Sequence, residues 1–207
     1  SGCWRLTSVT LPENLTSLGY RAFEECAFLS EIIVQSKNLT LNGNYAGTCQ
    51  PFYNAGSRTD GITVTFAEGC QVVPAKMFSE DGSSLVKAIF SNTVTSIGEE
   101  AFYKCSNLQN VTLPESLTSI GKYAFAGCTA FTSVTLPAKL ETLGERSFDG
   151  TTKLSEIIVK AVALKNITDS YGANGQPFYG AGTGTDGITV TFAEGCTKVP
   201  GSMFYTR

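Results

Sequence analysis

The sequence of 207 residues contains no histidine. Imidazole is the commonest general base, a member of most catalytic triads and the commonest zinc ligand, so its absence argues against most enzymes and metalloproteins. We therefore predict that the chain is not an enzyme and that it binds neither a metal nor a cofactor.

Runs of one charge and long apolar stretches are also missing. The formal net charge is −3, and without a basic patch the chain is not expected to bind nucleic acid. No apolar stretch approaches the roughly 18 residues of a membrane-spanning helix, so we expect no transmembrane segment in this chain. No charged and then apolar leader stands at its start.

What the sequence does contain is a repeat of 23 residues. Residues 108–130, LQNVTLPESLTSIGKYAFAGCTA, follow the pattern L-x-x-V-x-L-P-x-x-L-x-x-I-G-x-x-A-F-x-x-C-x-x, in which Leu108 is position 1. A fixed period of this size is typical of a solenoid, whose units must stack because none buries a core alone. We expect a single domain over residues 1–207, with units at about 6–28, 29–60, 61–84, 85–107, 108–130, 131–153, 154–186 and 187–207.

A second, longer period is superimposed on the short one. Residues 29–60 and 154–186 are overlong units that share LSEIIV and PFY-x-AG, and the units after them share GITVTFAEGC. Leu6 thus corresponds to Phe131 and Gly61 to Gly187, which indicates that three units were duplicated together. Because Cys3 lies one period before Cys26, we also expect the chain to be an excised part of a longer array.

Within each unit, positions 4 and 6 are apolar and lie between polar or β-branched residues. This alternation predicts a short strand, and eight strands stacked about 4.8 Å apart would form one parallel sheet. The apolar pair at positions 10 and 13, closed by glycine or proline, predicts a turn. The A-F-x-x-C segment predicts one helical or 3₁₀ turn, because it is too short for an independent helix.

Phenylalanine recurs at position 18. Stacked rings on neighbouring rungs would form the spine of the core. The predicted column consists of Phe23, Phe52, Phe78, Phe102, Phe125, Phe148, Phe178 and Phe204.

The string LTSVTLPENLTSLGYRAFEEC at residues 6–26 resembles the BspA-like leucine-rich repeats of bacterial surface proteins. This resemblance covers nearly the whole chain. It implies a right-handed, β-rich α/β coil with a parallel sheet on its concave face and short helical or 3₁₀ turns opposite. It also implies an exported or surface-attached bacterial protein, since several members are adhesins or bind host matrix. The overlong units 29–60 and 154–186 break the 23-residue period, so we expect them to interrupt a uniform curvature of the solenoid.

Cysteine and glutamate also recur at fixed positions. Cys3, Cys26, Cys105 and Cys128 share position 21, and Cys70 and Cys196 replace apolar residues at position 10, so we interpret all six as small buried hydrophobic residues. Cys49, in an insert, is expected to be the exposed and reactive thiol. Position 8 holds Glu13, Glu68, Glu115 and Glu194, for which we favour a solvated turn over cation binding or catalysis.

The remaining hypothesis is that the chain recognises a protein or glycan partner. Its sheet face is rich in hydroxyl groups and lacks aromatic anchors, whereas the inserts carry tyrosine and arginine, the residue types that dominate interface energetics. Because PFY-x-AG recurs in both inserts and its phenylalanine belongs to the core column, the inserts are equally consistent with binding loops and with structural packing. Two alternatives stay open: a structural stalk, and a module that targets an enzyme outside this sequence to its substrate. The candidate contact residues are Glu31, Lys87, Asn110 and Glu156 on the sheet, and Tyr45, Tyr53, Arg58, Tyr171 and Tyr179 in the inserts.

Overall fold

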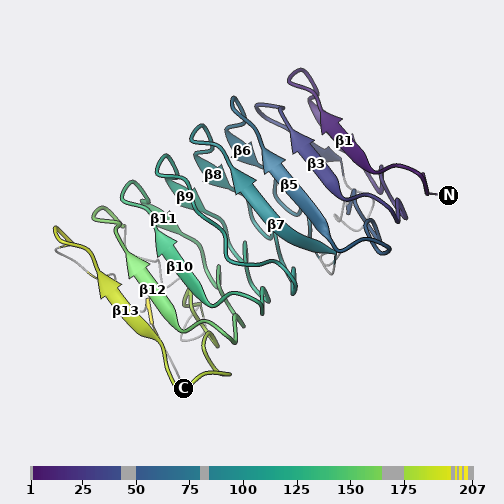
Figure 1. Cartoon of the computed structure of the whole chain (residues 1–207). Helices are drawn as coiled ribbons and strands as arrows, with labels where there is room; N and C mark the ends of the chain where they lie inside the picture. The colour runs from purple at the N-terminus through teal and green to yellow at the C-terminus, as the bar shows by residue number, and fades with distance from the viewer. Residues whose placement is uncertain are drawn as a thin grey trace.

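The computed structural model describes residues 2–42, 50–79, 84–164, 175–196, 199, 201 and 203–204. The chain winds into a β-solenoid whose turns, called rungs below, follow one another from the N-terminal end to the C-terminal end (Figure 1). Each rung contributes short strands to parallel sheets, as the repeat predicts. The solenoid fold is therefore confirmed.

The predicted strand at positions 3 to 6 forms the first row of strands. Residues at the same unit position pair directly, as in Val9 with Ile32 and Ile32 with Val64. The row is not one continuous sheet, however, but a four-stranded and a three-stranded sheet. Its strands are β1 (Ser8–Leu11), β3 (Glu31–Val34), β5 (Ile62–Phe66), β7 (Leu85–Phe90), β10 (Ser133–Leu136), β12 (Glu156–Val159) and β13 (Thr189–Phe192).

The interruption lies at residues 108–114, between β7 and β10, where no strand forms. Pro114 and Pro137 occupy position 7 on this rung and the next, and proline has no N–H to donate to the preceding rung. The Asn110 side chain takes over part of the ladder: its Oδ1 accepts from the backbone N–H groups of Thr132 (2.8 Å) and Ser133 (3.3 Å). Two successive prolines thus explain why one expected sheet is two.

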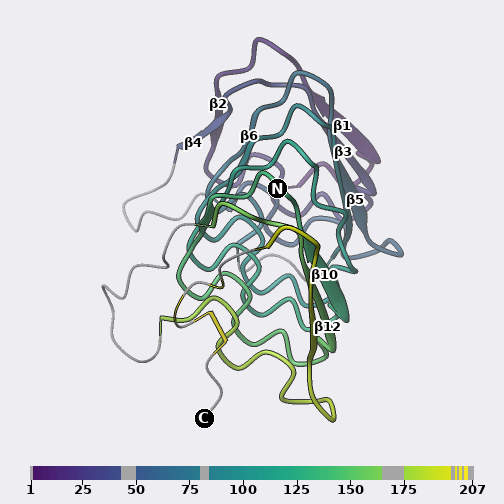
Figure 2. The ribbon, with the colours of Figure 1, turned by 90° about the vertical axis from the view of Figure 1, so that its left-hand side faces the viewer.

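A second row of parallel strands replaces the turn predicted around position 13. The apolar residue at that position points inward, as Ile97 and Ile120 do. Figure 2 shows the two rows on opposite sides of the solenoid. The second row consists of β2 (Ser17–Gly19), β4 (Thr40–Asn42), β6 (Val72–Val73), β8 (Ser96–Ile97), β9 (Ser119–Ile120) and β11 (Thr142–Leu143).

The A-F-x-x-C segments close each rung, and the predicted helical or 3₁₀ turn is wrong: none of the described residues is helical. Positions 16 and 20 adopt left-handed backbone angles, with φ from 41° to 75°, which a right-handed helix cannot include. Every second N–H then points along the solenoid to the next rung. The bonds run from Glu100 N to Lys122 O (2.8 Å), from Phe102 N to Ala124 O (2.8 Å) and from Lys104 N to Ala126 O (2.7 Å).

The phenylalanine column is confirmed. Each ring stacks on the next at centroid distances of 5.0 to 5.7 Å, from Phe23 at one end to Phe204 at the other. Interior members such as Phe102 and Phe125 are completely buried. The column therefore ties neighbouring rungs together and holds the surface residues of each rung in register.

Candidate functional site

A hollow on the turn side of the solenoid spans three consecutive rungs near the N-terminal end. It has a volume of about 610 Å³, within the range of small-molecule sites. We call it the three-rung hollow. It is lined by Trp4, Glu25, Ala27, Phe28, Asn54, Ser57 and Arg58.

Two large aromatic side chains are exposed in the three-rung hollow. Trp4 is 61% exposed and Phe28 is 39% exposed. The Arg5 guanidinium lies 4.5 Å from the centroid of the Trp4 ring, so one cation already contacts this indole. Covering large aromatic side chains lowers the free energy, so two of them exposed in one hollow favour a binding surface.

The polar side chains of the three-rung hollow are not used by the described fold. Among the described residues, none forms a hydrogen bond or ion pair with the side chains of Glu25, Asn54, Ser57 or Arg58. The backbone around them is engaged instead: Glu25 N donates to Tyr53 O (2.8 Å), and Arg58 N donates to Ala27 O (2.9 Å). The backbone is thus fixed, while these side chains have no partner within the described part of the chain.

The long period provides an internal comparison for this site. Arg58 N donates to Ala27 O at 2.9 Å, and its counterpart Gly184 N donates to Thr152 O at 2.9 Å. Likewise, Thr59 and Thr185 each donate a hydroxyl hydrogen to a glycine carbonyl at 2.9 Å. The two copies of the duplicated block therefore share one backbone geometry.

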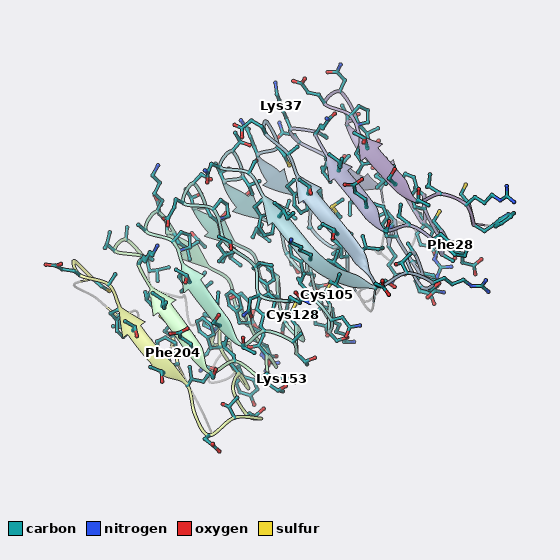
Figure 3. All side chains as sticks on the ribbon, in the orientation of Figure 1. Phe28, Lys37, Cys105, Cys128, Lys153 and Phe204 are labelled. Atoms are coloured by element: carbon teal, nitrogen blue, oxygen red, sulfur yellow. The ribbon has the colours of Figure 1, made fainter. Side chains whose placement is uncertain are left out.

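The exposed side chains of the two copies differ. Trp4 corresponds to Thr129, Phe28 to Lys153, Glu25 to Gly150 and Arg58 to Gly184. Figure 3 labels Phe28 and Lys153, which lie along the same edge of the solenoid. Because the same backbone forms without them, the aromatic and charged side chains of the first copy are not required by the fold.

Each candidate residue of the sheet lies on a different rung. Glu31 on β3, Lys87 on β7 and Glu156 on β12 are exposed on the same outer face of the first row. Asn110 is also exposed, but its amide is committed to the fold, since Nδ2 donates to the hydroxyls of Thr132 (2.8 Å) and Ser133 (3.2 Å). The sheet face thus presents dispersed polar groups rather than a concentrated cluster.

The insert tyrosines within the described part lie beside arginines of the preceding rung. The Arg21 guanidinium is 4.2 Å from the Tyr53 ring centroid, and that of Arg146 is 4.6 Å from Tyr179. Both rings are half-buried, so these pairs have a packing role in addition to any role in binding. Tyr45 and Tyr171 lie outside the described residues, as does Cys49.

Of the predicted insert residues that the structure describes, only Arg58 lines the three-rung hollow. The other exposed members of that hollow were not predicted because they lie on either side of the position 21 cysteine, at positions 20, 22 and 23, which the repeat leaves variable. A comparison of the two copies could have revealed them. Aromatic residues stand in the first copy where threonine and lysine stand in the second.

The cysteines follow the prediction inside the solenoid and depart from it near its ends. Cys26, Cys70, Cys105 and Cys128 are buried thiols. Cys3 is exposed and Cys196 is half-buried, so these two depart from the prediction that all six are buried. Burial raises the pKa of Cys70 to about 11 and also raises the pKa of Cys26 and Cys128, so these thiols are poor nucleophiles at neutral pH.

The position 8 glutamates lie at the surface. Glu13 pairs with Lys37 at 2.9 Å, and Glu115 pairs with Lys160 at 3.1 Å. The hydrogen bond from Lys37 and its positive charge lower the pKa of Glu13. Within the described residues, no three acidic or cysteine side chains lie close enough to hold a metal ion, and no helix is long and apolar enough to cross a bilayer.

Comparison with known structures gives the same fold. The chain is similar to a leucine-rich repeat protein of T. pallidum, with a TM-score of 0.55 and 17% identity over 90% of this chain and 72% of that one. It is also similar to the pneumococcal vaccine antigen PcpA, with a TM-score of 0.57 and 16% identity over 98% of this chain and 61% of PcpA. A search of curated proteins found no match.

Comparison with protein families gives a match over most of the chain. The family described as BspA type leucine-rich repeat region matches residues 1–79 and 71–175 in six copies. The repeat motif, the stacked register of its strands and this match agree, and the chain belongs to the BspA-type leucine-rich repeat family.

Proposed function

We propose that this chain is a non-enzymatic binding module of an exported or surface-attached bacterial protein, and that it recognises a protein or glycan partner in the manner of an adhesin. Membership of the BspA-type family supports this proposal. A protein of similar fold, PcpA, is a pneumococcal vaccine antigen, which agrees with a surface location.

The observation that carries the proposal is the three-rung hollow. Tryptophan and arginine are the residue types most enriched where binding energy concentrates, and here they share a hollow with an exposed phenylalanine. The duplicated copy holds the same backbone without them. A rigid frame with different side chains on equivalent turns is how solenoids vary their ligands.

Other surfaces contribute secondary contacts in this proposal. The sheet residues Glu31, Lys87 and Glu156 would meet polar groups of a large partner. Tyr53 and Tyr179 border the turn side on the same edge as the three-rung hollow, so an elongated partner could reach them too. These residues are assigned a smaller share of the binding energy because they are dispersed or half-buried.

The test is a binding screen of the chain against immobilised matrix proteins and glycans. The double variant Trp4→Thr/Phe28→Lys introduces the side chains of the second copy, so it should fold normally and lose the signal. The variant Tyr53→Ala/Tyr179→Ala should retain most of it. Equal signals from the parent and the Trp4→Thr/Phe28→Lys variant would refute the site, and a parent that binds nothing would favour the structural stalk.

A further inference from the structure

We propose that the three-rung hollow is a saccharide site that takes neutral sugar residues of a glycan. This inference rests on the proposed function and names the chemical class of ligand for the same site. It follows from three features of the hollow: its aromatic platforms, its balance of charge and its engaged backbone.

The aromatic platforms match the apolar faces of sugar rings. A pyranose ring presents C–H groups on one face and hydroxyl groups around its edge, so it can stack on an aromatic ring as a nucleobase does. Trp4 and Phe28 belong to neighbouring rungs, are both exposed and both line the three-rung hollow. Two platforms on adjacent rungs suit two linked sugar residues.

The polar side chains around the platforms suit hydroxyl groups. A hydroxyl both donates and accepts, and the three-rung hollow offers a carboxylate acceptor in Glu25, a guanidinium donor in Arg58, and groups of both kinds in Asn54 and Ser57. Among the described residues, none of these side chains has a partner that a ligand would need to displace.

The charges of the hollow favour a neutral ligand. A phosphate or acidic ligand would be drawn to Arg58 but would be repelled by the Glu25 carboxylate, which lines the same hollow. A cationic ligand would be attracted by Glu25 but repelled by Arg58, which lines the hollow, and by Arg5, which lies against the Trp4 ring. A ligand without net charge can use both groups as hydrogen-bond partners.

The engaged backbone argues against a peptide. Extended peptides bind mainly by adding main-chain hydrogen bonds to a free strand edge. In the three-rung hollow the nearby amides are already used: Glu25 N donates to Tyr53 O (2.8 Å), Gly56 N to Cys26 O (3.1 Å) and Arg58 N to Ala27 O (2.9 Å). Recognition must therefore come from side chains, as it does for sugars.

The sequence provides its own probe, because Trp4 is the only tryptophan. The full chain is titrated with galactose, mannose, fucose and N-acetylglucosamine, each as the free sugar and as short oligomers, while tryptophan emission is recorded. We expect a saturable change in emission with at least one series, stronger for the oligomer. Phe28→Lys should weaken that affinity by about tenfold or more.

The matched control is Lys153→Phe, which places the aromatic ring on the equivalent turn of the second copy and should leave the affinity unchanged. Thermal unfolding of Phe28→Lys should match the parent, because lysine occupies this place in the second copy. Sugar binding that leaves tryptophan emission unaltered, or that survives Phe28→Lys, would overturn the saccharide site.

The saccharide site would also be overturned if none of the sugars or oligomers bound to the chain. If proteins in the screen still bound the parent but no longer bound the Trp4→Thr/Phe28→Lys variant, the binding function would stand with a protein as its ligand. If neither sugars nor proteins bound, both proposals would fail together.

Discussion

At the scale of single residues, the position 18 phenylalanine accounts for most of the cohesion between rungs. Phe125 stacks on Phe102 at 5.2 Å and on Phe148 at 5.3 Å, so its removal leaves a cavity and loosens two interfaces at once. Phe204, at one end of the column, stacks on one ring and is 37% exposed.

Phe125→Ala should therefore lower the free energy of unfolding by about 3 to 5 kcal/mol. Phe204→Ala is the control and should cost clearly less, because its ring is partly solvated in the parent. Urea unfolding followed by circular dichroism measures both. An unchanged midpoint for Phe125→Ala would contradict the role of the column.

Because of the buried thiols, we expect the free energy of unfolding to fall as the pH becomes alkaline. Burial raises the pKa of Cys70 from its ordinary 9.0 to about 11, so the folded state holds this proton more tightly than the unfolded state. The resulting stabilisation is complete below the unfolded pKa and is lost as the pH rises toward the folded pKa.

Between about pH 8 and about pH 11, the parent should thus lose about 2 kcal/mol more stability than Cys70→Ala, which has no thiol to titrate at this position. Urea titrations at a series of pH values test this. Parallel losses in the two proteins would show that Cys70 does not carry the effect.

The sequence predicted these residue-scale features because each residue lies in one column of the repeat, phenylalanine at position 18 and small or aliphatic apolar residues at position 10. Period alone places Phe102, Phe125 and Phe148 over one another. It could not find Trp4 or Phe28, since their positions carry no repeated residue type, and exposure depends on which neighbouring turns cover them.

At the scale of the element, the close approach of neighbouring rungs explains the glycine at position 14. A Cβ on Gly121 would lie 2.5 Å from the backbone nitrogen of Glu99, on the preceding rung. Gly98 meets the same constraint, with the nitrogen of Ala75 at 2.5 Å. By contrast, a Cβ on Gly19 would meet no atom within 4 Å.

Gly121→Ala should accordingly cost about 1 to 3 kcal/mol, because backbone atoms must move to make room. Gly19→Ala, at the same unit position, should be nearly neutral. Thermal unfolding of the two variants side by side is the measurement, and equal losses would argue that chain flexibility, rather than packing between rungs, explains this glycine.

The elements that the sequence failed to predict all depend on contacts between rungs. The second row of strands exists because Ile97 pairs with Ile120 across rungs, which no single unit reveals. The helical turn was predicted from spacing alone, whereas the left-handed angles at positions 16 and 20 serve bonds to the next rung. The break at residues 108–114 follows from two prolines, each expected only to end a strand.

At the scale of the whole molecule, this break divides the first row into two sheets. The backbone amides of residues 110–113 have no partner among the described residues, whereas those of β5 lie between β3 and β7. Amides without a hydrogen-bond partner exchange with solvent more readily.

Hydrogen exchange followed by mass spectrometry should hence show faster exchange for residues 110–113 than for β5. The comparison lies within one protein, so it needs no variant. Equal protection of the two segments would mean that the first row is continuous in solution.

The two copies of the duplicated block divide the solenoid into a shared frame and a specialised surface. The same turns recur with the same hydrogen bonds, but only the first copy combines Trp4, Phe28 and Arg58. We therefore propose that partner recognition falls to this region of the first copy, and that the remaining rungs hold it in place.

Hydrogen exchange of the chain with and without the strongest binder from the screen tests this claim most directly. We expect slower exchange on binding in residues 4–5, 25–28 and 54–58, and no change in their counterparts 129–130, 150–153 and 180–184. Protection confined to the outer sheet face around Glu31, Lys87 and Glu156 would contradict it.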